Sequence, residues 1–201
     1  VDSLFLQSWE MQQRLSPRQQ LVDSEVTELR ESLTHVLGVH TEEAMREIEN
    51  NTRQIVELEL PYRVILTSLP ESSCRLNLLT RLSLYTDFTG FKSAICVNRY
   101  ESSSTVIVQE AQDFIALYEG LFVRLQKVVI ESYRNHNAFS QQTEIVERFS
   151  SEYARRIAEW DAIRPQAEDF ESNIDNAMEE THTTMEGCML QARDNAVAEF
   201  E

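Results

Sequence analysis

The chain has 201 residues, of which 18 are Lys or Arg and 34 are Asp or Glu, so its formal net charge is −16. This acidic excess argues against sequence-independent binding to nucleic acid or to anionic membranes, because both need a basic surface that neutralises phosphates. Gly and Pro number only four each, where average usage would give about fourteen and ten. The shortage of turn-forming residues points to long helices.

The first part of the chain is predicted to form short helices separated by breaks. A first helix runs to about Leu15, and Ser16-Pro17 then reads as an N-cap with Pro at the first helical position. Gly38 is expected to end the next helix, and Pro61 to end or kink the one after it. Between Pro17 and Gly38, residues on one helical face follow a 4,3,4,3 spacing: Val22, Val26, Leu29, Leu33 and Val36.

The middle of the chain contains the longest helical pattern. Pro70–Ser73 is predicted to be a loop, and Thr86–Gly90 a turn that interrupts a Leu-rich segment beginning at Cys74. Beyond this turn, apolar residues repeat at helical spacing from Phe91 to about Tyr133. An unbroken helix over that range would be about 65 Å long.

The last third shows two further stripes and no convincing strand. One stripe ends before Pro165 and the other continues from Phe170 to Ala196. The sequence therefore predicts an all-α fold, an elongated antiparallel bundle of about five to six helices including one very long central helix. We expect a single helical domain over 1–201, with a subdivision into N-terminal helices (1–70) and a long-helix hairpin (71–201) as the alternative.

Patterns typical of catalysis are absent from the sequence. It contains no Gly-x-Ser-x-Gly elbow, no phosphate-binding glycine loop, and neither an HExxH motif nor an EF-hand. Glu179 and His182 form one of the Glu-x-x-His pairs that di-metal bundles need, but a second pair is missing. We therefore predict a protein that is not an enzyme, with no catalytic residue, no cofactor and no metal ligand.

The three cysteines are Cys74, Cys96 and Cys188. On one straight helix Cys74 and Cys96 would lie about 33 Å apart, too far to bond, although a turn at 86–90 would bring them nearer. Cys188 falls on the apolar stripe of the last segment and could meet Cys96. We favour Cys96–Cys188 slightly over the other pairings, with Cys74 free or linking two chains.

Two features favour an extracellular location. The sequon Asn50-Asn51-Thr52 makes Asn50 a glycosylation candidate. The first residues, Val1 and Asp2, read like the start of a processed mature chain. We expect a secreted protein.

Charge and aromatic residues suggest two further kinds of partner. Residues 166–201 contain ten acidic residues and one basic residue, Arg193. This segment is either a solvated face or a surface that meets a cationic partner or an Arg-rich face of the bundle itself. Candidates for that face are the pair Arg155-Arg156 and the spread of Arg46, Arg53 and Arg63, within one chain or across a dimer. A hydrophobic ligand held inside the bundle would contact aromatic residues, and we expect Phe114, Phe122, Phe149, Tyr153 and Trp160 to line its cavity, with plain core packing as the alternative.

The placement of the cysteines within long helices resembles that of secreted insect proteins of the TsetseEP type. The matching features are Cys74-Arg75-Leu76, the run 90–96 ending at Cys96, a long helix, and the run 185–188 ending at Cys188. Those proteins are helical, cysteine-containing, mostly uncharacterised extracellular proteins of gut, reproductive tract and other secretions. The resemblance covers about residues 74–200 and implies secretion and a non-enzymatic role. The odd cysteine count and the lack of closely spaced cysteine pairs depart from the family, so neither a disulfide pattern nor a functional residue is carried over.

These observations predict a secreted, acidic helical-bundle protein with a structural or protein-interaction role, including self-association. The alternative is a carrier of a small hydrophobic ligand or lipid within the bundle. We expect no nucleic-acid partner and no membrane span, because no apolar run approaches the roughly 18 residues that a spanning helix needs.

Overall fold

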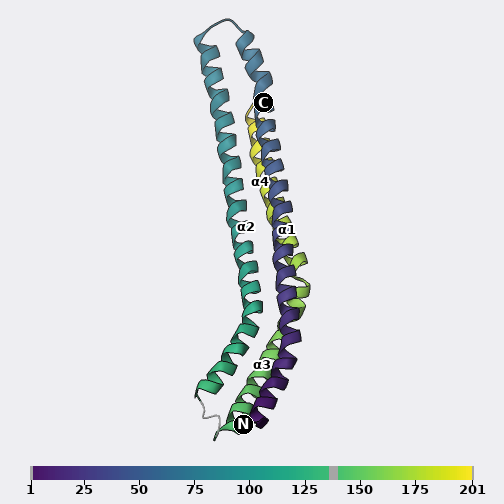
Figure 1. Cartoon of the computed structure of the whole chain (residues 1–201). Coiled ribbons are helices and arrows are strands. Elements are labelled where there is room, and N and C mark those ends of the chain that lie inside the picture. The colour runs from purple at the N-terminus through teal and green to yellow at the C-terminus, as the bar shows by residue number, and fades with distance from the viewer. Residues whose placement is uncertain (1, 136–139, 201) are drawn as a thin grey trace. The chain divides into compact units, whose positions relative to one another are not determined.

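The computed structural model describes residues 2–135 and 140–200, with side chains described except at 2–9, 11, 12, 15, 122, 124–126, 128–130, 132, 133, 135, 199 and 200. Four helices account for almost all of this part of the chain (Figure 1): α1 (Asp2–Ser68), α2 (Ser73–Asn135), α3 (Gln142–Glu168) and α4 (Phe170–Phe200). The all-α prediction is confirmed. None of the four helices in the described part is long and apolar enough to cross a membrane.

The predicted number of five to six helices is wrong, because the expected breaks lie inside helices. Helix α1 continues through Pro17, Gly38 and Pro61. A glycine inside a helix costs about 1 kcal/mol and a proline about 3 kcal/mol. The apolar stripe of α1 is buried on both sides of Gly38, from Val22 to Ala44, and its packing outweighs the cost of that glycine.

The very long central helix predicted for 91–133 is not matched either. Helix α2 begins at Ser73, passes through the expected turn at 86–90, and has a counterpart of similar length in α1. The hydroxyls of Thr86 and Thr89 donate to the carbonyls of Leu82 and Tyr85, one helical turn earlier. These threonines are therefore satisfied within the helix and do not form a turn.

Two other connections lie close to their predicted positions, and the predicted helix end at 134–137 falls partly outside the described residues. The chain turns at Leu69–Ser72, and the Ser72 hydroxyl caps α2 by accepting a hydrogen bond from the Arg75 N–H. Pro165 stays inside α3, whose end comes only at Asp169. There the backbone N–H of Asp169 bonds the Pro165 carbonyl, and Phe170 begins α4.

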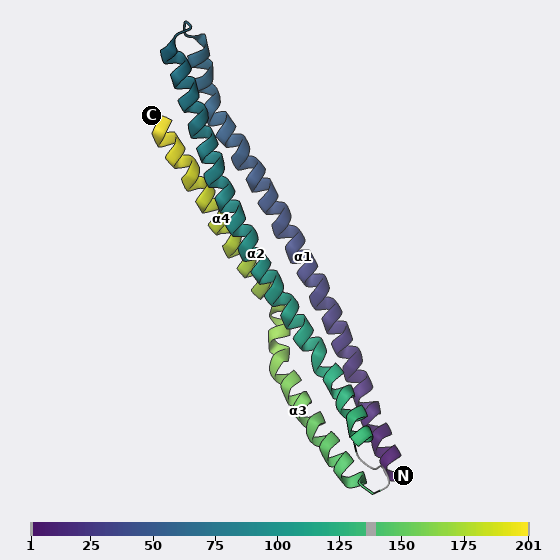
Figure 2. The ribbon, with the colours of Figure 1, turned by 90° about the vertical axis from the view of Figure 1, so that its left-hand side faces the viewer.

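The chain forms two compact units. Unit 1 comprises Val1–His35 and Gln109–Ile174, and unit 2 comprises Val36–Val108 and Asp175–Glu201. In unit 1, α3 packs on segments of α1 and α2, whereas in unit 2 the rest of α4 lies beside both α1 and α2 (Figures 1 and 2). The single domain and its alternative division at residue 70 stay predictions.

The two units have different cores. Unit 1 buries mainly aromatic and branched residues, including Val22, Val26, Leu29, Ile115, Tyr118, Ile145, Phe149, Trp160 and Phe170. Unit 2 buries more small and sulfur-containing residues, namely Ala44, Cys96, Met178, Met185, Met189, Ala192 and Ala196, together with Val36, Ile55, Leu82 and Tyr100.

Candidate functional site

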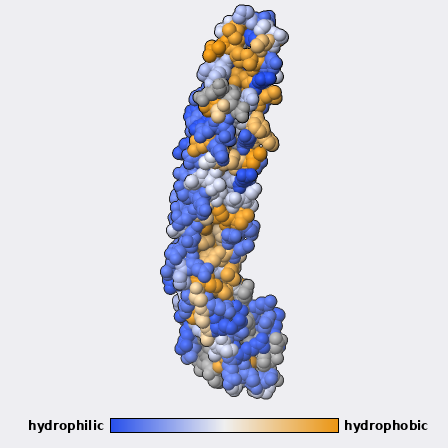
Figure 3. Space-filling model, turned by 180° about the vertical axis from the view of Figure 1, so that it is seen from behind, coloured by the Kyte–Doolittle hydropathy of each residue, from blue (hydrophilic) through white to orange (hydrophobic). Residues whose placement is uncertain are grey.

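The most distinctive surface of the described chain is apolar and belongs to unit 2. Among the side chains that the structure describes, every large exposed hydrophobic residue except Leu21, Leu117 and Val123 lies in this unit. Hydrophobic residues gather near the end that carries the loop between α1 and α2 (Figure 3). At this end the α1–α2 hairpin extends past the last turn of α4 (Figures 1 and 2). There α1 and α2 pack on each other without α4.

Helix α2 carries the clearest part of this surface, a stripe of four residues that we call the outward stripe. It consists of Leu84, Phe88, Phe91 and Ile95, with exposed fractions of 62%, 54%, 63% and 37%. The spacing of 4,3,4 places them on one face of the helix. The opposite face, which packs into unit 2, contains the following buried residues: Leu82, Thr89, Ser93, Cys96 and Tyr100.

The outward stripe was missed in the sequence because it spans the segment that was interpreted as a turn. Thr86–Gly90 contains Asp, Gly and two Thr residues, which are typical of turns. The heptad-like spacing of Leu84, Phe88, Phe91 and Ile95 was the signal that could have identified the stripe, and it also supports continuous helix there.

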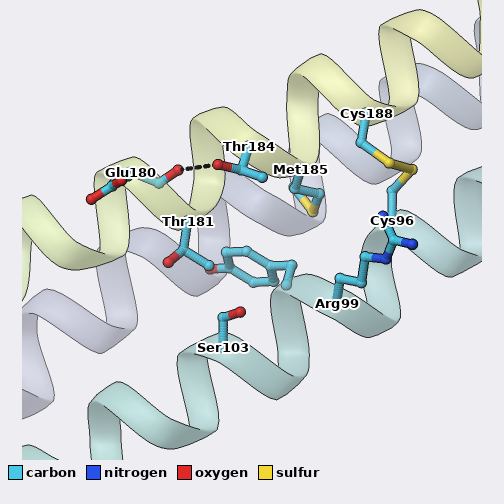
Figure 4. Close-up of a pocket in the computed structure, with 9 residues that line it drawn as sticks. Cys96, Arg99, Ser103, Glu180, Thr181, Thr184, Met185 and Cys188 are labelled. Carbon is cyan, nitrogen blue, oxygen red and sulfur yellow. Dashed lines mark hydrogen bonds between the residues drawn. A yellow bond between two sulfur atoms is a disulfide. The ribbon is translucent and has the colours of Figure 1, made fainter.

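A disulfide joins α2 to α4 inside unit 2 (Figure 4). The bonded residues are Cys96 and Cys188, whose Cα atoms are 5.8 Å apart, within the usual range for a disulfide. This is the pairing that the sequence favoured slightly. Cys74 is exposed and forms no disulfide within the described chain.

A small hollow of about 180 Å³ opens beside this disulfide (Figure 4). Tyr100 and Ser103 from α2 line it together with Thr181 and Met185 from α4. Sites for drug-sized ligands usually have volumes of about 300–1,000 Å³, so this hollow is too small for a lipid. A second hollow of about 550 Å³ lies on α1 and is lined by Ile48, Glu49, Thr52, Arg53, Val56 and Glu57. Because it is open to solvent along one helix, it does not enclose a ligand, and the carrier hypothesis stays a prediction.

The aromatic residues predicted to line a cavity lie in unit 1, whereas the residues that line the hollow belong to unit 2. The ring of Phe114 stacks on that of Phe170 at a centroid distance of 5.4 Å, and Phe149 lies 6.5 Å from Tyr153. Trp160 is buried. These contacts are those of a packed core. The side chain of Phe122, the fifth predicted residue, lies outside the described part of the chain.

A hydrogen-bonded chain connects three helices in unit 1. The Trp160 Nε1–H donates to the Tyr118 hydroxyl at 2.8 Å, and that hydroxyl donates to the Glu25 carboxylate. Arg164 Nε lies 3.4 Å from Glu25 Oε1. Burial, reinforced by the adjacent Glu25 carboxylate, raises the pKa of Tyr118 well above its usual range. The chain therefore fixes how α1, α2 and α3 align in unit 1.

Polar side chains also meet inside unit 2. Asn51 Nδ2 donates to Ser93 Oγ at 3.1 Å, and both residues are buried. Its neighbour Asn50, the glycosylation candidate, lies within α1, and its Oδ1 accepts a hydrogen bond from Arg53. Glycosylation of Asn50 stays a prediction.

A second polar group in unit 2 gathers possible metal ligands from α1 and α4. His40, Glu43 and Glu179 each offer one ligand atom, and these three atoms lie within 4.8 Å of one another. His40 is buried, Glu43 is half-buried and Glu179 is exposed. In the sequence Glu179 pairs with His182, whereas in the fold it lies beside His40 and Glu43. Only His40 and Glu43 are close in the chain, so the sequence does not predict this group.

The arginines expected to meet the acidic last segment pair mostly within their own helices. Arg155 and Arg156 contact Glu152 and Glu159, all on α3. The hydrogen bond from Arg155 lowers the pKa of Glu152. Arg155 is exposed, whereas Arg156, Glu152 and Glu159 are half-buried. Because these pairs lie within α3, they leave the role of the acidic segment open.

No protein-family model, curated protein or solved structure matches this chain. The resemblance to the TsetseEP type therefore stays a prediction, as does secretion.

Proposed function

We propose that this chain is a secreted, non-enzymatic helical-bundle protein that works through protein contacts, and that it binds a second copy of itself through the outward stripe of α2. The observation that carries the proposal is the exposure of four large apolar side chains, Leu84, Phe88, Phe91 and Ile95, on one face of a helix. Full burial of each such side chain stabilises by about 1.5–3 kcal/mol relative to full exposure. A contiguous apolar surface of this kind is typical of an interaction site.

The spacing of the stripe favours another helix as the occupant. Residues repeating at 4,3,4 form the seam of a coiled coil, in which the side chains of one helix fit between those of its partner. The same helix of a second copy supplies the same spacing. The stripe is therefore complementary to itself in a two-fold pair, which is the commonest symmetry of soluble oligomers.

The charges beside the stripe favour a parallel pair. Asp87 directly precedes Phe88, and Lys92 directly follows Phe91. In a parallel coiled coil, a residue that precedes a seam position lies opposite the partner residue that follows the next seam position. Asp87 precedes the seam residue Phe88, and Lys92 follows the next one, Phe91. Asp87 of each copy therefore faces Lys92 of the other. Within one copy, Lys92 Nζ lies 4.5 Å from the centroid of the Phe88 ring, which places this charge at the edge of the outward stripe.

Polar residues limit the apolar contact at one end. Asn77 and Arg81 occupy the seam positions that precede Leu84. Polar residues at a seam lower stability but specify its register. We therefore assign the apolar contact to 84–95 and regard Asn77 and Arg81 as residues that set the register.

The disulfide supports the extracellular part of the proposal. Disulfides persist in oxidising compartments and are rare in the cytosol. Cys96–Cys188 closes a sequence separation of 92 residues and joins two helices of unit 2, which is the position of a structural bond.

Sedimentation equilibrium over a range of concentrations tests the self-association. The wild-type mass should rise from the chain mass of 23.4 kDa toward twice that value. Phe91→Glu should remain at the chain mass, because each copy would bury a charge in the seam. Val123→Glu is the matched control, since Val123 is 61% exposed on the same helix but in unit 1, and it should behave as wild type.

Two results would exclude this interface. One is a wild-type chain that stays monomeric at every concentration. The other is a Phe91→Glu variant that associates as strongly as Val123→Glu. Circular dichroism of both variants should show the wild-type helix content, because both substituted side chains are exposed.

A further inference from the structure

The His40 side chain in unit 2 is almost fully buried, with 3% of its surface exposed, and its two ring nitrogens have different surroundings. Nε2 lies 2.8 Å from Asp175 Oδ1. A carboxylate can only accept a hydrogen bond, so Nε2 carries the proton. In the neutral imidazole Nδ1 is then an acceptor with a free lone pair.

Nδ1 of His40 has no hydrogen-bond partner among the described residues. The nearby Glu43 Oε2, at 3.8 Å, is itself an acceptor and cannot satisfy the lone pair. A buried polar atom without a partner costs about 1–3 kcal/mol. A cation between the ring nitrogen and the carboxylate would satisfy both.

Glu179 completes the group from the other helix. One of its carboxylate oxygens lies within 4.8 Å of the ligand atoms of both His40 and Glu43. His40 and Glu43 are one turn apart on α1, whereas Glu179 comes from α4. Ligand atoms of three residues from two helices of unit 2 therefore lie within 4.8 Å of one another.

We propose that His40 Nδ1, Glu43 and Glu179 bind a divalent transition-metal ion, with Zn²⁺ as the fitting ion, and that Asp175 orients the histidine. Zn²⁺ accepts histidine nitrogen and carboxylate oxygen at about 2.0–2.2 Å, and in open sites it takes three protein ligands with water in the fourth position. Ca²⁺ and Mg²⁺ prefer oxygen ligands alone. The hydrogen bond from a metal-binding histidine to a carboxylate, here Asp175, is the usual outer support of such sites.

The two ligand carboxylates have room to close on the ion. Ligand atoms around a tetrahedral Zn²⁺ lie about 3.4 Å apart, while Glu43 Oε2 is 3.8 Å from His40 Nδ1. Glu179 is exposed and Glu43 is half-buried, so rotation of their side chains supplies the difference. The bound ion ties α1 to α4 within unit 2, independently of any second copy.

Titration of the wild-type chain with Zn²⁺, followed by calorimetry, tests the site. We expect one saturable ion per chain and a higher melting temperature with the ion bound, because a ligand that binds only the folded state stabilises it. Glu179→Gln should weaken binding by about tenfold or more, since it removes a ligand and its charge. Glu180→Gln, one residue along the same helix, is the matched control and should bind as wild type.

A second pair of variants separates His40 from general attraction to an acidic chain. His40→Asn should lose the saturable site, whereas His35→Asn, at an exposed position on the same helix, should keep it. If His40→Asn fails to fold, Glu179→Gln still tests the site, because Glu179 is exposed. The site is refuted if the wild type shows no saturable binding, or if Glu179→Gln and Glu180→Gln lose affinity equally.

Discussion

The two units contain segments of the same helices α1, α2 and α4, yet they differ in how each is stabilised. In unit 1 helix α2 turns Tyr118 inward to a buried hydrogen-bonded chain. In unit 2 the same helix turns Thr89 and Ser93 inward and leaves Phe88 and Phe91 exposed. A helix that buries polar residues while exposing aromatic ones has a second face that its own unit does not use.

The two units also differ in where their aromatic side chains lie. Unit 1 buries Tyr118, Phe149, Trp160 and Phe170 in its core, and Phe114 stacks on Phe170. Unit 2 depends on a disulfide and on small and Met side chains. The exposed aromatic residues and the buried His40 of unit 2 are not part of that disulfide and Met-rich core. The proposed interface and the proposed metal site therefore both belong to unit 2.

Loss of the disulfide should have the largest effect on this comparison. Cys96→Ser with Cys188→Ser should lower the free energy of unfolding by about 4 kcal/mol, because the bond closes a long loop and restricts the unfolded chain. Urea unfolding measures the loss. Hydrogen exchange should show that amides of unit 2 lose more protection than those of unit 1. Cys74→Ser is the control, and an equal loss in that variant would contradict a structural role for the disulfide.

A smaller loss is expected for the hydrogen-bonded chain of unit 1. Tyr118→Phe should lower stability by about 2 kcal/mol, because it removes the hydroxyl that accepts from Trp160 Nε1–H and donates to the Glu25 carboxylate. Tyr153→Phe, at a half-buried position on α3, should change stability by less than about 0.5 kcal/mol. Equal effects in the two variants would mean that the chain does not stabilise unit 1.

The same residue gives unit 1 a dependence on pH. The pKa of Tyr118 is raised in the folded chain, chiefly by burial, while an unfolded tyrosine titrates near pH 10. The unfolded state therefore loses its proton first, and stability should fall as the pH rises above about 10. Unfolding curves measured on both sides of that pH should show a smaller fall for Tyr118→Phe than for wild type.

The sequence predicted fold class and core better than element boundaries. The 4,3,4,3 stripe from Val22 to Val36 is buried as expected, because burial on one helical face leaves a periodic pattern. Gly38 was expected to end a helix, Pro61 to end or kink one, and Gly90 to lie in a turn, yet the helices continue through all three. A local preference of about 1–3 kcal/mol is visible in sequence, whereas the packing that overrides it comes from distant segments.

The candidate sites were harder to predict for the same reason. His40 and Glu43 are close in sequence, but Asp175 and Glu179 join them only through the fold. The outward stripe was visible as a pattern, but only the fold shows that α2 already buries its opposite face. Cys96 and Cys188 could be favoured as a pair because both fall on helical stripes.

The exposed Cys74 provides the most direct test of the proposed parallel pair, because it lies on the seam two heptads before Phe88. In a parallel pair equivalent seam residues face each other. Oxidised glutathione should then accept the two electrons and two protons of the Cys74 thiols, giving an interchain disulfide and two molecules of reduced glutathione. The covalent dimer is measured on non-reducing gels, with Cys74→Ser as the blank. The account predicts rapid dimer formation in wild type and Val123→Glu and much slower formation in Phe91→Glu, whereas equal rates in all three, or no dimer in any, would contradict it.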